Sequence, residues 1–339
     1  MDAYINFIEY YLPEQRLTNE MINAEHPEWS ADKISSKTGI YSRPIAERNE
    51  FASDLALNAT QKLFLKSGIS PEKLDFLLYC TQSPDYFLPT TACILQDQLH
   101  LPNSAGALDF NLGCSGYVYG LSIAKSLILG GQAENMLLIT SETYSKYIHP
   151  KDKGNKTLFG DGAAASSVTA QPNGDFRAKI RDFVFYTDGK GYDRLIVKNG
   201  GIRYRNVHGS DEFNEEGSFS KNDSYLYMDG KAIFEFTNFI VPPLIDKALS
   251  KNRLKKEEID LFIFHQANAF MMHTVRKRCQ IPDEKFFIFI KDCGNTVSST
   301  IPIALKEAFN QGRVKPGMKI LLAGFGVGLS AAVGVLEIC

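Results

Sequence analysis

Cys114 stands between two glycines at the start of an apolar segment, DFNLGCSGYVYGLSIAKSLILGG, which runs from Asp109 to Gly131. A free cysteine in apolar company is most often a packed core thiol. A helix that begins just after Cys114 would instead direct free N–H groups and the positive end of its dipole at the sulfur, favouring the thiolate. Gly113 and Gly116 would permit a strained strand-to-helix turn that presents the sulfur to a substrate. The segment therefore predicts either a core thiol or a nucleophile.

Two more residues could act beside such a thiol. His265 follows the apolar run LFIF and opens HQAN, and Asn295 lies in CGNTVSST. A lone histidine beside a sheet is more often structural, but a position at the exit of a strand favours a functional role. Asn295 reads either as a helix N-cap or as an uncharged donor to a developing oxyanion or enolate.

A glycine-rich loop, GFGVG from Gly324 to Gly328, follows an apolar strand near the end of the sequence. A dinucleotide-binding loop is excluded because too little chain follows for a helix, a second strand and the acidic residue that binds ribose. The loop instead suits a nest of backbone N–H groups for an oxyanion. A thiol, an imidazole, an amide and such a nest suit acyl transfer through a thioester, or a cysteine hydrolase.

The elements that must position these residues alternate short apolar runs with longer amphipathic stretches, which predicts an α/β protein. Four runs are almost continuously apolar, as buried parallel strands are: 74–80, 135–142, 259–265 and 318–324. The segment 167–186 predicts two further strands joined by a turn at Pro172-Asn173-Gly174.

An internal repeat relates the two ends of the sequence. PEKLDFLLYCTQ resembles KEEIDLFIFHQA, and GCSGYVYGLSIAKSLILGG aligns with GNTVSSTIPIALKEAFNQG so that Cys114 matches Asn295 and Gly131 matches Gly312. A buried strand follows in both copies. The repeat predicts a duplicated strand–helix–strand unit, with Cys114 and Asn295 at equivalent helix starts. We expect two similar halves, residues 1–170 and 171–339.

Composition excludes several classes of protein. The formal net charge of −2 gives no sign of binding to nucleic acid or to an anionic membrane. No run approaches the roughly 18 apolar residues of a membrane span, and the start does not read as a secretory signal. The six cysteines are scattered without a C-x-x-C pair, which argues against a zinc site or a disulfide framework and predicts a reducing, cytoplasmic location.

The chain resembles the β-ketoacyl-acyl-carrier-protein synthase III family of the thiolase superfamily over nearly its whole length. The resemblance rests on motifs in the family's order: SSKTGIYSR, NLGCSGYVYGL, LFGDGAAA, FHQAN, GNTVSS and the terminal GFGVGLS. It implies a layered αβαβα sandwich of two similar halves, assembled as a homodimer. It also implies acyl-CoA and malonyl-acyl carrier protein as substrates, with no cofactor and no metal.

By this resemblance, Cys114 takes the acyl group from an acyl-CoA primer, while the backbone N–H groups of Cys114 and Val327 form the oxyanion hole. His265 and Asn295 then bind the thioester carbonyl of the malonyl carrier protein and stabilise the enolate that decarboxylation creates. The enolate carbon attacks the acyl-cysteine in a decarboxylative Claisen condensation that gives a 3-oxoacyl-acyl carrier protein. Phe159 corresponds to an aromatic residue near the departing carboxylate.

The resemblance also places Gly326, Gly328 and Leu88 around the substrate. Leu88 matches a residue that reaches across the dimer to close the partner's acyl pocket, where short-chain members have Phe. The smaller side chain predicts room for a longer or branched acyl group.

The entrance departs from the family pattern. Housekeeping members carry a Trp at the position of Lys33, and Trp29 is displaced from it in the sequence; Phe270 replaces an Arg. Basic residues remain at three entrance positions, Lys37, Lys153 and Lys277. An altered entrance with intact catalytic residues predicts a divergent or pathway-specific member.

Three alternatives accompany the condensing enzyme. One is an acyltransferase of the same superfamily that passes the acyl group to an alcohol or amine. Another is a non-catalytic partner subunit, although such subunits usually lose the nucleophile that Cys114 retains. An unrelated cysteine hydrolase would explain neither the repeat nor the order of the motifs.

Overall fold

A single mixed sheet organises the computed structural model, which describes residues 2–339. Within these residues ten strands pair in the order β14-β13-β15-β16-β8-β1-β7-β6-β4-β5. One half of the sheet comprises β1 (Tyr4–Tyr11), β4 (Phe76–Cys80), β5 (Gly106–Phe110), β6 (Asn135–Glu142) and β7 (Gly162–Thr169). The other comprises β8 (Ala178–Thr187), β13 (Leu261–Phe264), β14 (Phe286–Phe287), β15 (Lys319–Gly326) and β16 (Ser330–Ile338).

The two halves repeat one pattern of pairing. Strand β4 runs parallel to β5 and β6, β6 is antiparallel to β7, and β7 is antiparallel to β1. Strand β13 likewise runs parallel to β14 and β15, β15 is antiparallel to β16, and β16 is antiparallel to β8. The halves meet where β1 and β8 pair, Tyr4 opposite Lys179 and Ile5 opposite Ala178. The exact division at residue 170 stays a prediction.

The two strands expected around residues 172–174 are present as β7 and β8, but they do not pair with each other. Strand β1 lies between them and pairs with both. The side chain of Asn6 in β1 donates to Thr169 Oγ1 at 2.7 Å and accepts from the Asn173 N–H at 3.0 Å, so the turn crosses over β1. A turn motif predicts a change of chain direction and does not determine which strand fills the space.

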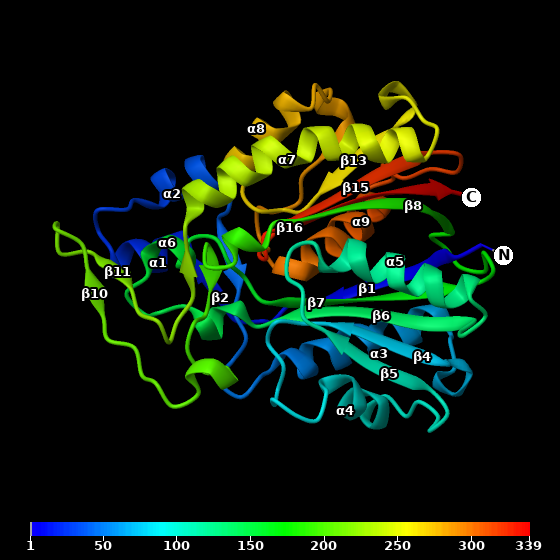
Figure 1. Ribbon diagram of the computed structural model, residues 1–339, viewed down its shortest axis with the longest axis horizontal. Coiled ribbons are helices and arrows are strands. Elements are labelled where there is room, and N and C mark those ends of the chain that lie inside the picture. The colour runs from blue at the N-terminus through cyan, green and yellow to red at the C-terminus, as the bar shows by residue number, and fades with distance from the viewer. Residues whose placement is uncertain (1) are drawn as a thin grey trace.

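Helices form three layers around the sheet, as Figure 1 shows. Helices α3 (Ala52–Ser67) and α4 (Thr91–Gln98) cover the first half, and α7 (Gly230–Lys251) and α8 (Ala269–Arg278) cover the second. Helices α5 (Gly116–Leu129) and α9 (Thr300–Asn310) lie between the halves. This arrangement is the predicted αβαβα sandwich. Within residues 2–339 no helix combines the length and hydropathy needed to span a membrane.

Short elements gather at one end of the molecule, on the left in Figure 1. They are β2 (Arg16–Thr18), α1 (Asn19–Glu25), α2 (Ala31–Thr38), β3 (Ser42–Pro44), α6 (Lys153–Lys156), β9 (Leu195–Ile196), β10 (Glu212–Phe213), β11 (Phe219–Lys221) and β12 (Tyr227–Met228). Residues of α2 and β12 line the approach to the site described below.

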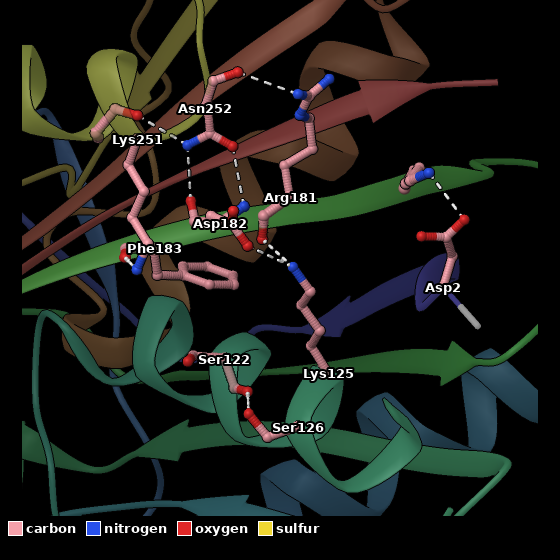
Figure 2. Close-up of polar contacts among 11 residues, drawn as sticks. Asp2, Ser122, Lys125, Ser126, Arg181, Asp182, Phe183, Lys251 and Asn252 are labelled. Atoms are coloured by element: carbon pink, nitrogen blue, oxygen red, sulfur yellow. Dashed lines mark hydrogen bonds and ion pairs between the residues drawn. The ribbon is translucent and has the colours of Figure 1, made fainter. Parts of the chain in front are cut away.

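The central helices α5 and α9 are largely apolar because each side of them faces one half of the sheet. The two helices also end in the same way. Gly131 and Gly312 both adopt φ +67°, a left-handed conformation that glycine reaches without steric cost and that ends a helix. Lys125 of α5 donates to the Arg181 carbonyl at 3.0 Å and to Asp182 Oδ1 at 2.9 Å (Figure 2). Asn252, just after α7, donates to the Asp182 carbonyl, so these contacts join α5 and α7 to β8.

Candidate active site

Cys114 lies in the turn between β5 and α5 and is 4 % exposed. Burial raises the pKa of its thiol to about 12, while hydrogen bonds from the backbone of Val327 and of Cys114 itself act in the opposite direction. The sequence predicts that the start of α5 favours a thiolate, but burial acts against the thiolate and raises the pKa above its ordinary value. Cys114 rests as a neutral thiol.

The glycines beside Cys114 serve close packing. Gly113 and Gly116 are not among the residues with positive φ, so the predicted strained turn is absent at these two described positions. A Cβ atom on Gly113 would lie 2.6 Å from Val327 Cγ1, and one on Gly326 would lie 2.8 Å from Cys114 Sγ. Such distances are too short for carbon or sulfur contacts. The glycines therefore let the loop after β15 lie directly against the nucleophile.

His265 follows β13 and is 2 % exposed. Its Nδ1 lies 2.7 Å from Thr300 Oγ1 at the start of α9, and its ring meets Phe325 edge to face. Burial lowers the pKa of His265 to about 3, although hydrogen bonding to the Val297 backbone acts in the opposite direction. The imidazole is therefore neutral at physiological pH.

Asn295 does not cap a helix. Its Oδ1 accepts from the Val297 N–H at 2.9 Å, which leaves the Nδ2 group for other acceptors. Its backbone N–H donates to the Leu158 carbonyl at 2.9 Å and its carbonyl accepts from the Gly160 N–H at 3.0 Å. These bonds form a parallel bridge that sets Phe159 beside Asn295.

An inner cavity brings the predicted catalytic residues together. It is lined by Cys114, His265, Asn295, Phe159 and Gly326, together with apolar residues that include Leu158, Leu195, Met228, Ile233 and Phe325. The thiol comes from the first half of the fold, and the imidazole and the amide come from the second. The cavity thus holds one soft nucleophile and two neutral polar side chains in apolar surroundings, which suits a thioester substrate.

An outer groove adjoins this cavity, since the two share Leu158, Met228 and Gly230. Trp29, Lys33 and Lys37 line the groove, together with Asp152 and Tyr227 among others. The entrance, which departs from the family pattern in sequence, is therefore lined by an aromatic side chain and by lysines.

Trp29 reaches this groove despite its displacement in the sequence. It directly precedes Ser30, the N-cap of α2, and its ring lies 6.0 Å from Lys33 Nζ. Lys153 Nζ lies 5.5 Å from the same ring and forms an ion pair with Glu28 at 2.7 Å. An indole with ammonium groups around it is a typical cation–π arrangement.

Other predicted residues lie elsewhere. Within the described chain, Phe270 and Lys277 line neither the outer groove nor the inner cavity; Phe270 is 62 % exposed on α8 and stacks on Phe234 at 5.5 Å. Leu88 is 81 % exposed between β4 and α4, away from the cavity of its own chain. Gly328 is exposed at φ +137°, in the loop just after the cavity-lining Gly326. The roles of these residues stay predictions.

Sequence reasoning missed several residues that line the cavity or support the candidate catalytic side chains. Thr300 contacts His265, and Met228 and Leu195 come from short strands remote in sequence from every motif. Glu142, at the end of β6, is fully buried and accepts from Ser298 just beyond Asn295. An acidic residue at the end of an apolar strand was the available signal for this carboxyl.

Comparisons with known proteins agree with the geometry. The model of the 3-oxoacyl-[acyl-carrier-protein] synthase III family matches residues 108–189, and the model of the C-terminal part of that synthase matches residues 249–338. The beta-ketoacyl-[acyl-carrier-protein] synthase III of Clostridium perfringens is 37 % identical over 328 residues, 97 % of each chain.

Solved structures show the same likeness. A crystal structure of a 3-oxoacyl-(acyl-carrier-protein) synthase III superposes with a TM-score of 0.95 at 46 % identity, covering 99 % of this chain and 100 % of the other. The 3-oxoacyl-(acyl-carrier protein) synthase of Burkholderia xenovorans gives a TM-score of 0.88 at 32 % identity, covering 99 % and 94 %. The chain belongs to the 3-oxoacyl-[acyl-carrier-protein] synthase III family of condensing acyltransferases.

Proposed function

We propose that Cys114, His265 and Asn295 join an acyl-CoA primer to malonyl-acyl carrier protein by decarboxylative condensation. The observation that carries the proposal is one buried cavity in which a thiol from one half faces an imidazole and an amide from the other. A groove with a tryptophan and lysines leads to this cavity from the surface.

In the first step the Cys114 sulfur attacks the acyl thioester, and coenzyme A leaves as a thiol with the proton that Cys114 gives up. The tetrahedral oxyanion between these states is stabilised by the backbone N–H groups of Cys114 and Val327. Hydrogen bonding from both groups acts on the sulfur in the free protein, which supports this assignment. Close packing of Gly326 against the sulfur brings the loop within reach.

In the second step the malonyl thioester loses carbon dioxide, and the electron pair of the broken bond becomes an enolate. Asn295 holds its Oδ1 on Val297 and can offer its Nδ2 N–H to the thioester oxygen. Neutral His265 carries a single N–H, which it can offer from Nε2 when the Thr300 hydroxyl donates to Nδ1. The enolate carbon then attacks the acyl group on Cys114, a carbon–carbon bond forms, and the cysteine sulfur is released. Decarboxylation supplies the carbanion, so no metal or cofactor takes part in this proposal.

The outer groove suits coenzyme A. Trp29 offers an aromatic face to the adenine, and Lys33, Lys37 and Lys153 offer cations to the phosphates. We assign Lys277 and Phe270 on α8 to the docking of the carrier protein. The substitution of Lys33 for a family tryptophan is thus compensated by Trp29.

We further propose a homodimer in the cytoplasm. The segment around Leu88 is apolar and exposed, with Tyr86 at 62 % and Phe87 at 69 %, which supports its burial by a second copy and a role of Leu88 in the partner's acyl pocket. Within residues 2–339 the six cysteines are free thiols, as a reducing compartment requires.

The test is intact-protein mass after mixing with a panel of acyl-CoAs and acyl-carrier proteins of graded chain length. We expect an adduct on the wild type from primers longer than acetyl, and none on Cys114→Ala. Acylation by acetyl-CoA alone, with longer primers refused, would overturn the assignment of Leu88. The absence of any adduct would indicate a non-catalytic partner subunit. Transfer of the acyl group from Cys114 to an alcohol or amine would indicate the alternative acyltransferase of the same superfamily.

A further inference from the structure

One short turn, the 3₁₀ helix Val297–Ser299 before α9, controls both of the polar side chains that face Cys114. The Val297 N–H donates to Asn295 Oδ1 at 2.9 Å. Thr300 Oγ1 lies 3.0 Å from the Val297 carbonyl oxygen and 2.7 Å from His265 Nδ1. A displacement of the turn would therefore move the amide and the imidazole together.

The turn does not hold its shape by local preference. Val297 adopts φ +54°, and a β-branched side chain in the left-handed region is a genuine outlier. Such a conformation persists only where surrounding contacts impose it, and it occurs most often at functional sites. The turn must therefore be anchored from outside.

The anchors come from β6, in the opposite half of the fold. Ser298 Oγ donates to Glu142 Oε1 at 2.9 Å, and Ser299 Oγ lies 2.9 Å from Thr140 Oγ1. The second oxygen of Glu142 accepts from the Gln82 N–H at 3.0 Å and from Ser83 Oγ at 3.1 Å. Glu142 thus spans two segments, and one of its oxygens serves the strained turn.

A carboxyl is an unfavourable choice for a purely structural hydrogen bond at this depth. Glu142 is 0 % exposed, and burial raises its pKa to about 8, while the hydrogen bonds from Gln82, Ser298 and Ser83 act in the opposite direction. Asp161 also raises this pKa, and Cys80, Cys114 and Tyr144 are electrostatically coupled to the same carboxyl. Burying an acid without a cationic partner lowers the stability of the fold. A group kept at that cost is expected to serve a function.

We propose that Glu142 is a positioning residue for the condensation step: through Ser298 it holds the Val297–Ser299 turn so that Asn295 and His265 direct their N–H groups at the malonyl thioester. This inference rests on the roles proposed above for these two residues. It concerns mainly the second step, because within the described residues no hydrogen bond runs from the turn's hydroxyls to Cys114 or Val327.

The experiment measures two rates separately: acylation of Cys114 by an acyl-CoA, followed by mass, and decarboxylation of malonyl-acyl carrier protein. Ser298→Ala removes the link itself, and Glu142→Leu removes the carboxyl. A misplacement of this kind costs about 10- to 100-fold, so we expect that loss in the kcat of decarboxylation, with acylation and the malonyl KM within about 2-fold of wild type.

Two further variants separate positioning from stability. Glu142→Gln keeps a side-chain amide that can donate a hydrogen bond to the Ser298 hydroxyl or accept one from it. Its rate of decarboxylation should therefore lie within about 3-fold of wild type. Ser83→Ala removes a buried hydrogen bond from the same carboxyl without touching the turn, and should leave both rates near wild type. Thermal unfolding of each variant identifies any that fail to fold. If Glu142→Leu does not fold, the result for Ser298→Ala decides whether Glu142 is a positioning residue.

Wild-type decarboxylation by Ser298→Ala would overturn the inference, as would equal losses of acylation and decarboxylation that Ser83→Ala reproduces. Asn295→Ala serves as the reference. If that variant decarboxylates normally, the assigned role of Asn295 fails. If it is impaired while Ser298→Ala is not, only the positioning role of Glu142 fails.

Discussion

The start of α5 and the start of α9 are equivalent positions in the two halves, yet they do opposite chemistry. Helix α5 begins two residues after Cys114, and backbone hydrogen bonds act on the sulfur to which we assign the attack on the substrate. Before α9 the chain instead makes the strained Val297–Ser299 turn, which captures Asn295 Oδ1 and leaves the amide N–H groups free to donate. Duplication supplies two equivalent places, and the local turn decides whether each provides an electron pair or a hydrogen-bond donor.

The largest effect should come from removing the electron pair. Cys114→Ala should abolish acylation, a loss of about 10⁴-fold or more, while the second half still binds and slowly decarboxylates malonyl-acyl carrier protein. Carbon dioxide release and the mass of the protein measure the two activities. Loss of both in a folded variant would show that the halves do not act independently.

Removing the donor should give the converse result. Asn295→Ala should keep the acyl adduct on Cys114 and slow condensation by about 10²- to 10³-fold, as expected for loss of one oxyanion donor. Product formation from a preformed acyl-enzyme measures the second step. A variant that condenses normally would mean that the amide has only a structural role.

A smaller effect is expected in the outer groove, whose residues are proposed to bind the substrate and not to react with it. Trp29→Ala should raise the KM for acyl-CoA by about 10-fold, the worth of one stacked base, and leave the kcat nearly unchanged. Steady-state rates at several primer concentrations separate the two constants. An unchanged KM would show that the ring does not contact coenzyme A.

The last prediction concerns stability. Because the folded pKa of Glu142 is raised to about 8 from its ordinary value, the native state holds a proton that the unfolded chain releases between about pH 4.5 and 8. Glu142 therefore favours folding at low pH, and this contribution disappears as the pH rises through that window. Denaturant unfolding at pH 5 and pH 8 should show a smaller loss for Glu142→Gln than for the wild type, and equal losses would contradict the assignment.

Much of this molecule follows from its sequence. The apolar runs predicted four buried strands, the repeat predicted the equivalence of Cys114 and Asn295, and the motif order predicted the family. Local patterns failed where long-range packing decides the outcome: β1 lies between β7 and β8, and burial raises the pKa of Cys114 although a helix begins just after it. The bond between Ser298 and Glu142 joins residues 156 positions apart, which no spacing rule relates.

The pairing of β1 with β8 has a consequence for how the enzyme can change. Within residues 2–339 the strand register gives two residue pairs at that junction, and α5 and α9 lie between the halves. In the proposed mechanism, one half holds the acyl group and the other activates its partner. The alignment of the halves therefore sets the gap across which the new carbon–carbon bond must close. Substitutions in α5 and α9, remote from every substrate atom, are a route to altered turnover without any change in the reacting groups.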